Sequence, residues 1–115
     1  MANAADPKQV NYGRRKELRR ERAYLGSLRD VMGTPSGRLV VEALLTRVGV
    51  WKSTFNRDPM TMAYDEGRRS VGVELLKELD ALGSALYDQL VAERRARLEA
   101  DRREDDAVIT ANQED

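Results

Sequence analysis

Apolar residues in most of the chain recur at steps of three, four and seven residues, the spacing of an α-helix. The first such series consists of Leu18, Leu25, Leu28 and Met32. Residues 1–13 lack this period and contain a proline and a glycine. We therefore predict an extended arm over residues 1–13 and a first helix that begins at Arg14 and ends at Gly33.

The second predicted helix has the clearest boundaries. Thr34 is a favoured N-cap, Pro35 suits the first helical position, and Gly49 is a typical residue just beyond a helix end. Between these boundaries, apolar residues cover most of the circumference of the helix. The remaining polar stripe is Arg38, Glu42 and Thr46. A helix of this kind is usually covered on several sides, so we expect it to form the centre of the core.

A third helix is predicted from Asp58-Pro59, a second N-cap and first-position pair, to about Leu79. Gly67 and Gly72 lie inside it, where each glycine costs about 1 kcal/mol relative to alanine. We therefore expect both glycines to allow close packing. The turn that follows, residues 80–83, is short enough to join antiparallel helices.

The fourth predicted helix starts near Ser84 and becomes almost entirely charged after Val91. Glu93–Arg97 and Glu99–Arg103 stand four residues apart with the acid first, an order that stabilises a helix. The mostly acidic end, residues 105–115, is expected to be flexible.

These patterns predict an all-α fold: a single small bundle of three to four helices with a long charged C-terminal helix and flexible termini. We divide the chain into an extended arm (1–13), a helical domain (14–92) and a charged helical extension with an acidic tail (93–115). A length of 115 residues allows one core of modest size.

The amino-acid composition excludes most common kinds of catalytic site. The chain has no Cys and no His, which excludes thiol nucleophiles, histidine-based triads and the common zinc sites. Adjacent acid pairs such as Asp65-Glu66 diverge by about 100° on a helix and do not share a ligand easily. We expect no catalytic residue, no metal site, no cofactor and no enzymatic activity. The longest apolar run, residues 39–45, is far shorter than the roughly 20 residues that span a bilayer, so we expect no membrane segment.

Positive charge gathers at the start of the first helix. Residues 8–22 hold seven basic side chains against two acidic ones, although the whole chain has a net charge of zero. Lys8 belongs to this cluster, and the residues we single out are Arg14, Arg15, Lys16, Arg19, Arg20 and Arg22. They would bind nucleic-acid phosphates or an acidic protein partner, or form a solvated helix face, and these interpretations stay open.

The opposite end is acidic. About five negative charges lie between Glu104 and Asp115. Such polarity favours head-to-tail contact between copies, and hence a homo-oligomer. Neutralisation of the two ends within one chain is the alternative.

Four further residues are candidates for a partner interface: Trp51, Phe55, Arg68 and Arg69. The two aromatics lie in a loop with no helical period, and Trp and Arg are enriched at binding hot spots. The alternative for Trp51 and Phe55 is an anchor that holds the loop on the core. For Arg69 it is a local pair with Asp65, four residues earlier.

Three blocks together resemble a small all-helical family encoded among the virion structural genes of short-tailed bacteriophages. They are Met32-Gly-Thr-Pro-Ser-Gly-Arg38, Gly49-Val-Trp-Lys-Ser-Thr-Phe55 and Glu66-Gly-Arg-Arg-Ser-Val-Gly-Val-Glu-Leu-Leu76. The resemblance spans roughly residues 25–88 and leaves both charged ends outside. It implies a structural protein of the virion, made in the host cytoplasm, with other virion proteins of the portal, tail or internal core as partners.

The leading hypothesis is therefore protein–protein docking at the head–tail junction, the tail or the internal ejection core. A small DNA-contacting or host-directed regulatory protein that uses the basic start of the first helix is the runner-up. An inhibitor of a host enzyme is a third class that the sequence leaves open.

Overall fold

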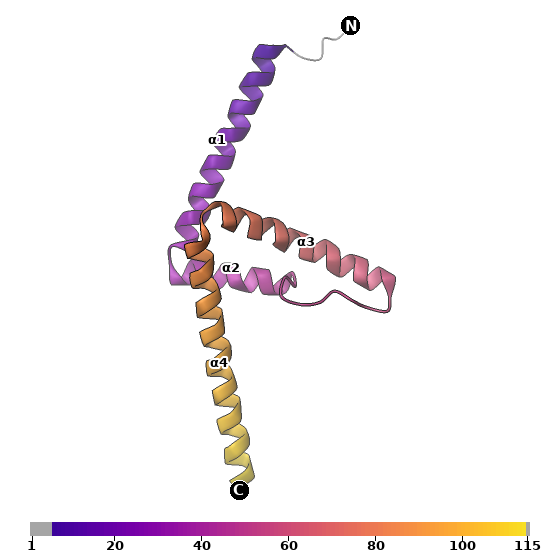
Figure 1. Cartoon of the computed structure of the whole chain (residues 1–115), viewed down its shortest axis with the longest axis vertical. Helices are drawn as coiled ribbons and strands as arrows, with labels where there is room; N and C mark the ends of the chain where they lie inside the picture. The colour runs from indigo at the N-terminus through magenta and orange to yellow at the C-terminus, as the bar shows by residue number, and fades with distance from the viewer. Residues whose placement is uncertain (1–5, 115) are drawn as a thin grey trace.

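The computed structural model describes residues 6–114, which form four α-helices and contain no strand. The helices are α1 (Pro7–Met32), α2 (Pro35–Arg47), α3 (Pro59–Ala81) and α4 (Ser84–Glu114). The predicted all-α class is confirmed. The chain extends over 83 × 39 × 17 Å, with α1 and α4 pointing to opposite ends of the long axis and α2 and α3 forming a hairpin to one side (Figure 1).

Local sequence accounts for the helix boundaries. The side chains of Asp6, Thr34 and Asp58 each accept a hydrogen bond from a backbone N–H in the first turn, and each is followed by a proline. At the end of α2, Gly49 has a φ of +79°. Its N–H donates to the Thr46 carbonyl and the N–H of Val50 donates to the Leu45 carbonyl, the double hydrogen bond of a Schellman motif. Gly83 has a φ of +98° beyond α3.

The core lies where the end of α1, α2, the end of α3 and the start of α4 meet (Figure 1). Its buried apolar members are Leu28, Met32, Val41, Leu45, Leu79 and Leu90. Partly buried side chains of α3, α4 and the residues after α2 surround them. The helices therefore join at one small junction, and α1 and α4 extend well beyond it and do not pack along their full lengths.

Glycine permits close contacts at two places. A Cβ on Gly37 would overlap the carbonyl group of Val31, so α2 approaches the end of α1 only because this side chain is absent. A Cβ on Gly72 would come within 2.5 Å of Val48, so Gly72 lets α3 approach the end of α2 as expected. Gly67 has open space around it, and the expectation of close packing there is wrong.

Both predicted termini need correction. Residues 7–13 are helical, because Asp6-Pro7 is a third cap signature equivalent to those before α2 and α3. Of the predicted arm, residues 1–5 lie outside the described residues. The acidic end is helical to Glu114, because no glycine or proline interrupts the sequence after Ser84. Asp115 lies outside the described residues.

We predict opposite effects for two Gly→Ala substitutions. Gly37→Ala should lower the free energy of unfolding by about 1–3 kcal/mol, because the added methyl overlaps backbone that cannot move away cheaply. Gly26→Ala is the matched control: it lies inside α1 in open space and should raise stability by about 0.5–1 kcal/mol. Urea unfolding of both variants checks this, and a Gly37→Ala variant as stable as wild type would contradict the packing described.

Candidate functional site

A buried arginine joins three helices at the junction. The Arg38 side chain from α2 is only 4% exposed. Its Nη1 donates to the Met32 carbonyl at the end of α1, at 2.9 Å. Its Nε and Nη2 donate to the Glu93 carboxylate of α4, at 3.0 and 2.8 Å. This paired geometry satisfies the guanidinium and fixes the positions of the three helices relative to one another.

The contact with Arg38 lowers the pKa of Glu93. Hydrogen bonds from Arg38 hold the pKa of the Glu93 carboxyl below its ordinary value, and the charges of Arg38 and Arg97 act in the same direction. Desolvation opposes this shift and is smaller. Glu93 is therefore held in its charged form at the junction.

A second ion cluster lies one turn along the same two helices. The Glu42 carboxylate lies 3.3 Å from Nη2 of Arg97 and 3.7 Å from Nε of Arg94. The Arg94 guanidinium also lies 4.2 Å from the centre of the Trp51 ring, a cation–π distance. Arg38 and Glu42 of the polar stripe of α2 therefore face α4. Glu93 and Arg97, predicted to pair with each other, instead reach Arg38 and Glu42 on α2.

The four predicted interface residues are not brought into one site. Trp51 is half-buried, packs on the core and lies under Arg94, an anchoring position. Phe55 is 79% exposed. The Arg68 guanidinium donates to the Arg47 carbonyl at the end of α2 and lies 5.8 Å from the centre of the Tyr64 ring. Arg69 is half-buried on α3.

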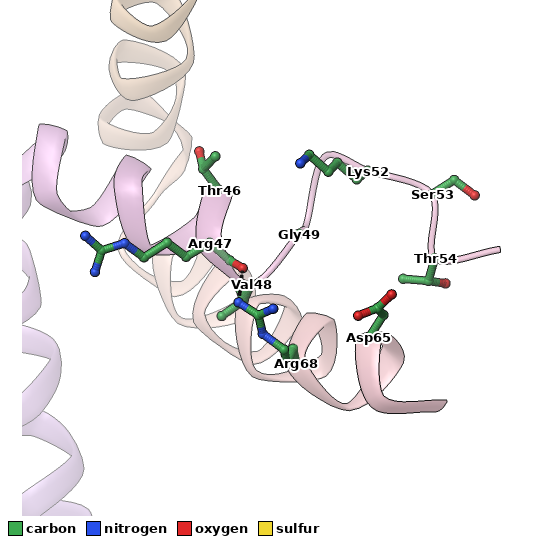
Figure 2. Close-up of a pocket in the computed structure, with 9 residues that line it drawn as sticks. All are labelled: Thr46, Arg47, Val48, Gly49, Lys52, Ser53, Thr54, Asp65 and Arg68. Carbon is green, nitrogen blue, oxygen red and sulfur yellow. Dashed lines mark hydrogen bonds between the residues drawn. The ribbon is translucent and has the colours of Figure 1, made fainter. Parts of the chain in front are cut away.

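Arg68 also borders a pocket of about 210 Å³ at the tip of the hairpin (Figure 2). The pocket is lined by residues 46–49, residues 52–54, Asp65 and Arg68. Figure 2 shows the Arg68 side chain directed at the Arg47 carbonyl, whereas the Arg47 side chain extends away. A hydrogen bond between Thr54 and Glu66 ties the same loop to α3. These contacts give Arg68 a structural task, since a cation stabilises the carbonyl end of a helix.

The hairpin carries apolar residues on its outside. On α2 these are Leu39, Val40 and Leu44, and on α3 they are Met60, Tyr64 and Val71. Val40 is 57% and Met60 82% exposed. The expectation that α2 would be covered on several sides is therefore wrong. Apolar rows on a helical surface are typical of sites that another protein covers.

The two ends of the chain form charged arms. We define the basic arm as residues 7–24 of α1, where every residue except Gly13 is exposed. The acidic arm is residues 98–114 of α4, where all residues are exposed. The six basic residues singled out from the sequence all lie on the basic arm. In the described part of the chain none of them forms an ion pair with an acidic side chain: Arg14, Arg15, Lys16, Arg19, Arg20 and Arg22.

Within residues 6–114, no group of His, Cys, Asp and Glu side chains has an arrangement that would hold a metal ion. No helix of the described chain has the length and apolar character needed to cross a membrane.

A family model described as Bbp19-like phage protein matches residues 28–92, more than half of the chain. The chain belongs to this family of phage proteins. No curated protein and no solved structure matches it. The Bbp19-like segment contains the end of α1, the α2–α3 hairpin and the start of α4, including Arg38 and Glu42, and Glu93 is the residue directly after it. The basic arm and the acidic arm both lie wholly outside it.

The Glu93 contact predicts how the stability of this Bbp19-like protein depends on pH. A carboxyl whose pKa is lowered by folding stabilises the protein above its ordinary pKa of about 4.5, and this contribution is lost as pH falls through the lowered value. Glu93→Gln should therefore be less stable than wild type near neutral pH, and the two stabilities should converge in acid.

Thermal unfolding followed by circular dichroism from about pH 7 to about pH 3 measures this. The variant should still lose some stability as pH falls, because hydrogen bonds from Thr61 and from the N–H of Met60 also lower the pKa of Asp58. Glu99→Gln, at an exposed position of α4, is the control. The prediction would be contradicted if the difference in unfolding temperature between wild type and Glu93→Gln stayed the same from neutral to acid pH.

Proposed function

We propose that this phage protein is a structural component of the virion, and that it acts by docking other virion proteins at the head–tail junction, the tail or the internal ejection core. Membership in the Bbp19-like family supports a phage setting. The observation that carries the docking role is how few apolar side chains the junction of the helices buries: within residues 6–114, six are buried, whereas fifteen large apolar residues are exposed.

Most of those exposed residues lie on the parts of the chain that project from the junction. Phe55 and the outer rows of α2 and α3 lie on the hairpin, and Leu18 and Leu98 lie on the two arms. A protein partner would bury such residues, and helices that extend from a small centre present more surface than a compact domain of equal length. We therefore assign the protein a binding role and not a chemical one.

Mass spectrometry of purified, DNA-filled particles tests the virion assignment. The protein should be present at a constant ratio to the major capsid protein after the particles have been treated with protease and washed in high salt. A matched preparation of empty heads tells whether it enters before or after DNA. Complete absence from both preparations would overturn the proposal.

A DNA-contacting or host-directed regulatory role is the second candidate, favoured by the exposed basic arm. Seven basic side chains on one free helix would neutralise phosphates and release counterions. Under this role the affinity for duplex DNA should fall with added salt, and replacing Arg15, Arg19 and Arg22 by Gln should lower the logarithmic salt slope by about 3.

A salt series of fluorescence anisotropy measurements on labelled duplex checks this, with Lys52→Gln, Arg57→Gln and Lys77→Gln combined as the control, because these residues lie outside the arms. No affinity at low salt would exclude the DNA role.

A further inference from the structure

The two charged arms of one chain cannot neutralise each other. They leave the junction in opposite directions and end at opposite extremes of an 83 Å long axis (Figure 1). Electrostatic attraction in solution is screened over about 10 Å at 0.1 M salt. The structure thus removes the intramolecular alternative that the sequence left open.

The arms are matched in length and charge. The basic arm has 18 residues and the acidic arm 17, so each is roughly 26 Å long at 1.5 Å per residue. The basic arm holds seven basic and two acidic side chains, a net charge of +5. The acidic arm holds six acidic and two basic ones, a net charge of −4.

On each arm, apolar and charged residues share one face of the helix, with one apolar residue on the basic arm and two on the acidic arm. On the basic arm, Arg15, Leu18 and Arg22 follow at steps of three and four. On the acidic arm, Leu98, Asp101, Asp105 and Val108 follow at steps of three, four and three. Leu18 is 44%, Leu98 46% and Val108 55% exposed. A complementary helix would cover these side chains and place opposite charges beside them.

We propose that the basic arm of one copy packs antiparallel against the acidic arm of a second copy of this chain. The arms point in opposite directions, so a two-fold axis perpendicular to the long axis brings each basic arm beside the acidic arm of the other copy. Both arm pairs form together, and the assembly is a closed dimer. The N-terminal end of α1, positive in its helix dipole, then lies beside the negative C-terminal end of α4. A second copy of the chain thereby joins the other virion proteins as a partner in the docking role, so this inference rests on the proposed function.

Reciprocal charge reversal tests the pairing. One variant combines Arg15→Glu, Arg19→Glu and Arg22→Glu, and the other combines Asp101→Lys, Asp105→Lys and Asp106→Lys. Sedimentation should give wild type about twice the 13.0 kDa of one chain. Each variant alone should self-associate at least about tenfold more weakly, because six screened pairs are lost and like charges face each other. An equimolar mixture of the two should recover the dimer.

All substituted positions are exposed on the arms, so circular dichroism should show unchanged helicity. Lys52→Glu, Arg57→Glu and Lys77→Glu together make the control for the Arg→Glu variant, with the same change of net charge outside the arms, and should dimerise as wild type does. The absence of Cys allows a second readout. With residue 7 level with residue 114, Leu18 lies nearest Asp101 and Asp105 of the acidic row, so Leu18→Cys mixed with Asp101→Cys should form a disulfide-linked pair under mild oxidation, whereas Leu18→Cys mixed with Phe55→Cys should not.

A wild-type monomer at high concentration and low salt, or a dimer that both reversals leave intact, would overturn the pairing. These outcomes are separate from the proposed function: a dimer absent from particles contradicts only the virion role, and a monomer present in particles contradicts only the pairing.

Discussion

Arg38 is the constraint on which the arrangement of the helices depends. A guanidinium that is almost fully removed from water must have its N–H groups paired, since an unpaired buried charge is strongly destabilising. Here the partners come from two other helices, the Met32 carbonyl of α1 and the Glu93 carboxylate of α4. Six buried apolar side chains provide cohesion that is not directional, whereas the two partners of Arg38 determine which faces of the helices meet.

This constraint sets which face of α2 points into the protein. A polar stripe of Arg38 and Glu42 in an apolar helix would ordinarily face solvent. Because the facing part of α4 carries Glu93, Arg94 and Arg97, the polar stripe finds its partners in the interior. Leu39, Val40 and Leu44 are left outside as a consequence. The exposed apolar row and the buried ion pairs thus have a single cause.

A net charge of zero describes this chain poorly. The junction combines both signs in close contact, and the arms keep the two signs far apart. A helix needs few tertiary contacts to persist when it is rich in Ala, Arg and Glu and has no internal proline. The arms can therefore remain helical beyond the core, and their separated charges are available to partners.

Most helix boundaries follow from local sequence, because caps and stop signals act within a few residues. Thr34-Pro35, Asp58-Pro59 and Gly49 bound α2 and α3 where the pattern predicts, and Asp6-Pro7 starts α1 with the same signature, ahead of the start at Arg14 that periodicity predicts. The tertiary structure alone decided what each helix faces. Arg38 and Glu93 are 55 residues apart, and no local period records that they meet. The same holds for the arms, whose direction is set at the junction and not along the helices that form them.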